Sequence, residues 1–71
     1  MKKITIHTDM IQLDQLLKWA DVISSGGQVR ILIDERRVYV NGELCQVKRK
    51  QLHPGDIVEV RGIDTLQIVG E

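Results

Sequence analysis

The spacing of the apolar residues changes along this chain from the alternation of a strand to the three-and-four spacing of a helix. A chain with both patterns must combine strands and helices in one fold. Ile4 and Ile6 alternate with polar residues, and this pattern predicts a short strand with one buried face. Apolar residues then recur at helical spacing, which predicts a helix over residues 13–21. A second helix is predicted over residues 27–35, preceded by a pair of serines suited to its N-cap.

Two turn signals divide the second half of the chain into strands. Asn41-Gly42 is a strong hairpin signal, because both residues tolerate the positive φ of a type I′ turn. In His53-Pro54-Gly55-Asp56, Pro54 sets φ at the second position and Gly55 supplies a positive φ at the third. Strands are therefore expected over 38–40, 43–47, 57–60 and 66–69, with a basic loop over 48–51. The expected fold class is α+β, with two short helices packed on a small, curled, mostly antiparallel sheet.

The length of the chain limits its chemistry. Seventy-one residues are expected to form a single domain, 1–71, with a thin core and no room for a deep substrate pocket. No nucleophile lies beside an ordered base, so we expect no enzymatic activity. His7 and His53 have no Cys or His at ligand spacing, so we expect neither a metal site nor a cofactor.

The cysteine count and the N-terminus bear on the compartment. Cys45 is the only cysteine, so no internal disulfide forms, and it is expected to be a buried or half-buried residue of the return strand. The two lysines after Met1 are not followed by the apolar run of a signal peptide. No segment is apolar for the length that a membrane span needs. These features favour a cytoplasmic protein.

Charge is balanced overall but polarised along the chain. Ten basic residues match ten acidic ones. Between residues 36 and 53, however, five residues are basic and one is acidic, whereas between residues 9 and 25 three are acidic and one is basic. The basic middle of the chain is therefore the place to expect a polyanionic partner.

Four motifs occur in an order and spacing that resemble the S4-like RNA-binding domain, built around the αL motif. The core of the resemblance covers residues 13–60, and it is similar above all to stand-alone bacterial members, the YaaA- and YbcJ-type proteins. The motifs are Leu-x-x-x-Leu-Lys at Leu13–Lys18, the serine pair Ser24-Ser25 before the second helix, Val-x-Val-Asn-Gly at Val38–Gly42, and Leu-x-Pro-Gly-Asp-x-Val at Leu52–Val58.

The resemblance implies that the chain binds structured RNA, most often ribosomal RNA, with a role in ribosome assembly and as a monomer. The start of a helix favours a phosphate, and basic side chains near it contact further phosphates along the strand. The residues expected to bind RNA are Lys18, Ser25, Gly26, Gln28, Arg30, Arg36, Arg37, Tyr39, Lys48, Arg49 and Lys50.

Two positions depart from the family pattern. Gly26 stands where many members have an arginine, which removes one phosphate contact but frees the backbone to approach the RNA more closely. Arg36 stands where many have the glycine that ends the second helix, which adds a charge at the cost of backbone strain.

Each candidate also has an interpretation that needs no RNA. The basic loop 48–50 would then be a solvated loop, and Arg30 would pair with Asp34 one helical turn away. Tyr39 is expected to face outward from its strand, where cross-strand packing is more common than stacking on a base. For Trp19 we expect packing at the edge of the core, with its indole N–H reaching solvent, rather than base stacking.

A second class of function stays open beside RNA binding. Overall neutrality and Gly26 favour a protein–protein adaptor that keeps the fold and meets a ribosomal or replication protein. Binding to duplex DNA is less favoured, because neither helix carries a row of base-reading side chains.

Overall fold

Two helices and seven short strands make up the protein, and the computed structural model describes residues 1–71. The helices are α1 (Leu13–Trp19) and α2 (Gly26–Asp34). The strands are β1 (Lys2–Ile6), β2 (Ile11–Gln12), β3 (Val38–Val40), β4 (Glu43–Leu44), β5 (Gln51–Leu52), β6 (Ile57–Val60) and β7 (Asp64–Gly70).

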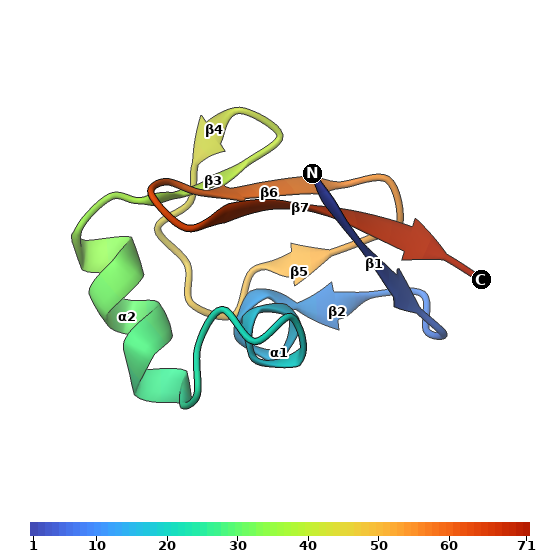
Figure 1. The fold of residues 1–71 in the computed structure, drawn as a ribbon, viewed down its shortest axis with the longest axis horizontal. Helices are drawn as coiled ribbons and strands as arrows, with labels where there is room; N and C mark the ends of the chain where they lie inside the picture. Colours follow the sequence, from blue (N-terminus) through green and yellow to red (C-terminus); the bar gives the residue numbers. More distant parts are fainter.

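Five of the strands form one mixed sheet in the order β1-β7-β6-β3-β4. Its neighbours are antiparallel except for β1 and β7, which run parallel with Ile4 opposite Ile68. β2 and β5 pair separately as a two-stranded antiparallel sheet. Figure 1 shows both helices and this small sheet on the same side of the five-stranded sheet. The predicted α+β class, with two helices against a mostly antiparallel sheet, is confirmed.

The core lies between these layers and contains only apolar side chains. Eighteen residues are buried, and none of them is polar or charged. Leu16 and Leu17 of α1 meet Leu66 and Ile68 of β7 in this one cluster. The alternation of Ile4 and Ile6 with polar residues gives β1 one buried face, and the helical spacing of the leucines gives α1 one buried face, as predicted.

Each helix is followed by a residue with left-handed backbone, Asp21 after α1 and Arg36 after α2. The first of these corrects the predicted end of the first helix. The first helix was expected to reach Asp21, but α1 ends at Trp19 because Asp21 has φ 59°. The N–H of Asp21 bonds to the carbonyl of Lys18 at 3.1 Å, and that of Val22 to Leu17 at 2.9 Å, the hydrogen bonds of a Schellman motif. The predicted second helix agrees with α2 to within one residue at each end.

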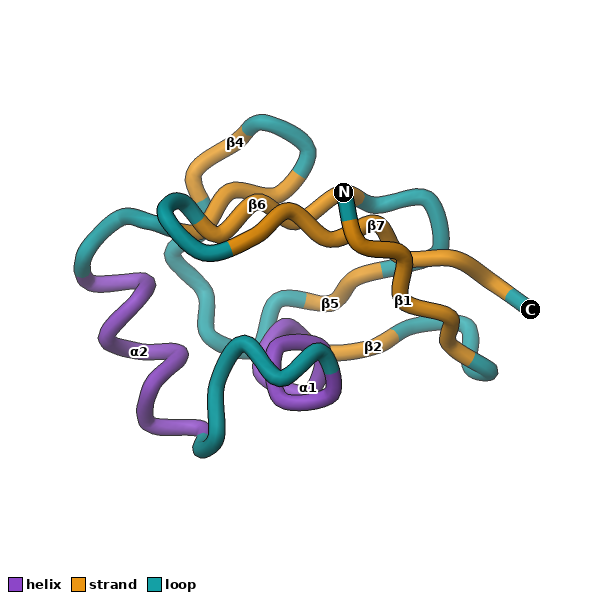
Figure 2. Tube along the Cα trace, viewed as in Figure 1, coloured by secondary structure: helices purple, strands orange, loops and turns teal.

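The strand predictions gave the second hairpin strand the wrong end and did not include the two strands of the small sheet. The return strand was expected over 43–47, but β4 ends at Leu44. Cys45 still donates its N–H to Val38 at 2.8 Å and is buried as expected, after which the chain leaves the sheet and passes beside α2 (Figure 2). β2 and β5 were missed because a strand of two residues has no alternation to detect.

The two predicted turns are confirmed. Asn41 and Gly42 have φ values of 51° and 84°, as a type I′ turn requires. Gly55 has φ 97°, and the Asp56 N–H bonds to the His53 carbonyl at 3.0 Å. Neither helix has the length and hydropathy needed to cross a lipid bilayer.

Candidate nucleic-acid interface

The first turn of α2 presents free backbone amides to solvent. Ser25 is its N-cap residue, as expected, but the serine hydroxyl makes no capping hydrogen bond. The Gln28 side chain instead accepts hydrogen bonds from the Ser24 N–H at 2.6 Å and the Ser24 hydroxyl at 3.3 Å, which holds the chain as it enters the helix. The amides of Gly26 and Gly27 have no acceptor within the helix, so they remain available to an anion.

Two lysines from distant parts of the chain both lie close to this helix end. A Cβ placed on Gly26 would lie 3.7 Å from the Lys18 ammonium nitrogen and 3.8 Å from that of Lys48. Neither lysine belongs to any of the four ion pairs of the protein. Two neighbouring ammonium groups without a carboxylate attract an anion, and the amides of the helix end add to that attraction. We call this group of Lys18, Gly26 and Lys48 the lysine pair site.

Arg30 continues this surface along α2. It lines a shallow groove with Lys48 and Gln46 from the loop between β4 and β5, and with Ile33 and Asp34. The alternative in which Arg30 pairs with Asp34 does not hold, because no ion pair forms between them. Its guanidinium is therefore free for a second anionic group.

Arg36, Arg37 and Tyr39 lie at the other end of α2, and two of them are occupied within the protein. The Arg37 guanidinium donates to the Arg61 carbonyl at 2.9 Å and to Glu35 at 3.3 Å. Tyr39 is half-buried on β3, with the guanidinium carbon of Arg61 4.0 Å from its ring centroid. Arg36 is exposed and has φ 57°, the left-handed backbone expected where the family has glycine.

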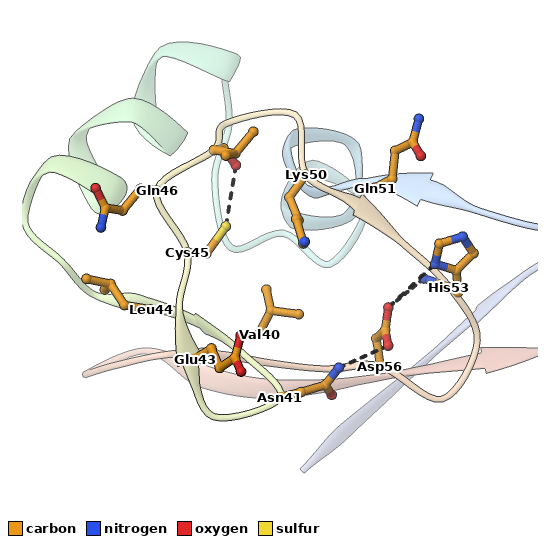
Figure 3. Close-up of a pocket in the computed structure, with 11 residues that line it drawn as sticks. Val40, Asn41, Glu43, Leu44, Cys45, Gln46, Lys50, Gln51, His53 and Asp56 are labelled. Carbon is orange, nitrogen blue, oxygen red and sulfur yellow. Dashed lines mark hydrogen bonds and ion pairs between the residues drawn. The ribbon is translucent and has the colours of Figure 1, made fainter.

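The lysines at the two ends of the basic loop point into different grooves. A turn closes the loop, with the Lys50 N–H bonded to the Val47 carbonyl at 3.3 Å. Lys48 lies toward α2, whereas Lys50 extends into a groove between the hairpin and the loop (Figure 3). Arg49 is exposed. Lys48 and Lys50 therefore line different grooves.

That groove contains a hydrogen-bonded junction between the two turns (Figure 3). The Asp56 carboxylate accepts from the Asn41 amide at 3.1 Å and from the His53 N–H at 2.8 Å, and Asn41 accepts from the Ile57 N–H at 2.9 Å. Burial raises the pKa of Asp56, but these two hydrogen bonds and the nearby charges of His53 and Lys50 outweigh it, so the pKa is lowered overall. Asn41 and Asp56 thus join the hairpin to the following turn.

The lysine pair site escaped sequence reasoning as a unit. Lys18, Gly26 and Lys48 were each named as candidates, but Gly26 was interpreted as the loss of a cation. The geometry adds that two ammonium groups lie 3.7 and 3.8 Å from where a Cβ of residue 26 would be. A glycine in place of the family's arginine, together with lysines on the first helix and in the basic loop, was the available signal.

Comparison with known proteins places this geometry in a family. The S4 domain model matches residues 4–69, which includes both helices and almost all of both sheets. A Bacillus subtilis (strain 168) protein named "Probable ribosome maturation protein RlbA" is 44% identical over 66 residues, covering 93% of each chain. Both matches agree with the resemblance found in the sequence motifs. The chain belongs to the S4 domain family.

Proposed function

We propose that this protein binds structured RNA, with ribosomal RNA as its target during ribosome maturation in the cytoplasm, and that it does so as a monomer without catalysing a reaction. The observation that carries the proposal is that the ammonium groups of Lys18 and Lys48 both lie close to Gly26, 3.7 and 3.8 Å from where its Cβ would be, at the N-terminus of α2. Its support from relatives is membership of the S4 domain family and the name of the similar Bacillus subtilis protein.

In this proposal one phosphate of the RNA backbone lies at the lysine pair site. The amides of Gly26 and Gly27 and the Ser25 hydroxyl donate to its oxygens, while Gln28 keeps the helix entry in place. Arg30 binds a neighbouring phosphate from the next turn of α2, because it faces the same groove as Lys48.

The remaining cations have lesser parts in the proposal. Arg36, Arg49 and Lys50 add to the positive field that attracts the RNA. Arg37 and Tyr39 act indirectly, by holding the β6–β7 turn in place. The Arg37 guanidinium already donates to the Arg61 carbonyl, and one face of the Tyr39 ring is already covered by the Arg61 guanidinium.

The test compares two double variants with the same change of net charge. Lys18→Ala with Lys48→Ala removes the lysine pair, and Lys2→Ala with Lys3→Ala removes two cations on β1, outside the proposed RNA surface. Binding to a ribosomal RNA fragment is measured by anisotropy across a salt series. If three to five phosphates are contacted, the logarithm of the affinity falls against that of salt with a slope of about −2 to −5. Because one phosphate contact is lost, the lysine pair variant is expected to make that slope shallower by about 1 and to weaken binding to all RNAs alike.

The control double variant should keep the wild-type slope. Equal losses in both variants would mean that only net charge matters and that the lysine pair is no site. A partner that stays bound to the protein in a lysate after ribonuclease treatment, with no RNA bound by the pure protein, would favour the adaptor function instead.

A further inference from the structure

The single tryptophan of the chain is left exposed at the end of α1. Trp19 was expected to pack at the edge of the core, and it is 57% exposed. Its indole N–H makes no hydrogen bond within the protein. An aromatic side chain that contributes little to the core and has no polar partner is a feature to explain through something outside the chain.

Trp19 is also the only aromatic ring whose faces are not taken by a cation. The chain has two aromatic residues, and the other, Tyr39, lies under the guanidinium of Arg61. No cation–π contact is made by Trp19. If the protein stacks on a base, Trp19 is therefore the residue equipped for it.

The position of Trp19 connects it to the lysine pair site. Trp19 follows Lys18 directly, and successive residues of an α-helix are rotated by about 100° around its axis. Since Leu13, Leu16 and Leu17 face the core, both Lys18 and Trp19 project from the exposed half of α1. The lysine reaches the start of α2. Trp19 is the next residue of the same helix, on the exposed half that Lys18 shares.

We infer that Trp19 stacks on an unpaired base of the RNA whose phosphate lies at the lysine pair site. The inference rests on the proposed RNA binding and specifies the class of RNA, a strand with at least one unstacked nucleotide next to the bound phosphate. A base is joined to its phosphate through one sugar, so in this inference a base of the strand held by Lys18 reaches the exposed ring of the next residue, Trp19. The bases of a continuous duplex are stacked inside it and offer no such face.

The test uses oligouridylate as a single strand, and the same strand annealed to its complement, with two readouts. Anisotropy of the labelled RNA reports affinity, and the emission of Trp19 reports stacking, without interference from any other tryptophan. Saturating single-stranded RNA is expected to quench Trp19, whereas the duplex binds with little quenching. Trp19→Ala should weaken single-strand binding about 5- to 100-fold, the range found for base–aromatic stacking, and leave duplex binding unchanged.

Two variants serve as controls. Trp19→Tyr keeps an aromatic face and should retain most of the single-strand affinity. Ile63→Ala truncates another exposed apolar residue, 48% exposed on the β6–β7 turn, and should change neither affinity. Circular dichroism verifies that each variant is folded.

The outcomes separate this inference from the proposed function. If both RNAs bind in a salt-dependent way but Trp19 is not quenched and Trp19→Ala binds as wild type, the stacking inference is wrong and RNA binding stands. Equal quenching by strand and duplex would also overturn it, because stacking on a base requires an unpaired one. If neither oligouridylate form binds but a ribosomal RNA fragment does, the stacking inference is wrong and the proposed function stands; if the ribosomal RNA fragment does not bind either, both fail.

Discussion

At the scale of single residues, Arg36 occupies a position whose left-handed backbone favours glycine. It is the first residue beyond the α2 cap and has φ 57°. Its N–H bonds to Ile33 at 2.9 Å and that of Arg37 to Leu32 at 3.0 Å, so the Schellman motif forms without the glycine that favours it. A left-handed residue with a Cβ costs about 1–2 kcal/mol. The position therefore carries strain that the surrounding hydrogen bonds maintain.

We predict that Arg36→Gly stabilises the protein by about 0.5–1 kcal/mol, because relief of the strain exceeds the extra entropy of glycine in the unfolded chain. For a domain of this size that raises the melting temperature by roughly 2–8 °C. Thermal unfolding followed by circular dichroism measures it. Arg36→Ala is the control, since it removes the same charge but keeps the Cβ; equal stabilisation by both variants would assign the effect to charge.

At the scale of elements, the junction between the two turns explains why their motifs occur together. Asn41 belongs to the β3–β4 turn and Asp56 to the turn before β6, and their side chains bond directly. Asn41 also exchanges backbone and side-chain hydrogen bonds with Ile57. The Asn-Gly and Pro-Gly-Asp motifs that supported the family resemblance therefore serve the fold, and the proposed RNA surface lies mainly on other residues.

This junction makes stability depend on pH in acid. Because the pKa of Asp56 is lowered in the folded state, its carboxylate stabilises the protein above the unfolded pKa of about 3.9. The contribution is lost as the pH falls below that value through the folded pKa. We predict that Asp56→Ala costs about 1–3 kcal/mol at neutral pH and progressively less below about pH 4. Urea unfolding at several pH values measures this.

The control for the junction is Asp9→Ala, which removes an exposed carboxylate that makes no hydrogen bond. It accounts for the change of net charge alone. If the cost of Asp56→Ala stays constant down to the lowest pH, the hydrogen bonds do not depend on the ionised carboxylate and the linkage to pH is absent.

At the scale of the whole molecule, some basic side chains form ion pairs and others do not, and the two groups lie at different places. Arg37 and Arg61 form ion pairs with Glu35 and Glu59, around the end of α2 and the β6–β7 turn. No ion pair is formed by Lys18, Arg30 or Lys48. Arg30 belongs to α2, and the two lysines lie next to the first half of that helix. A neutral chain thus has a locally cationic surface, which is compatible with RNA binding despite its charge balance.

The small core also sets how much damage the molecule tolerates. Leu17 is fully buried, and truncating such a leucine costs about 2–5 kcal/mol. A domain below about 80 residues rarely has more than about 3–5 kcal/mol in total. We therefore predict that Leu17→Ala is largely unfolded or nearly so at 25 °C, as measured by circular dichroism and urea titration. Ile31→Ala, at a residue 57% exposed on α2, should unfold close to the wild-type midpoint.

Local features of the fold followed from the sequence because their causes are local. The spacing of Ile4 and Ile6, the helical stripe of α1 and the positive φ of Asn41 and Gly42 depend on residues within a few positions of one another. The same reasoning failed at Asp21, where propensity does not show that a non-glycine residue adopts left-handed backbone.

The sequence by itself determined the α+β class, the turns, the family resemblance and the individual candidates for RNA binding. Only the tertiary structure decided that β1 runs parallel to β7, that Lys18 and Lys48 both lie close to Gly26, and that Arg61 covers a face of Tyr39 while Trp19 stays exposed. The reason is that these arrangements depend on how distant segments pack around one shared core, and no pattern within a single segment encodes that packing.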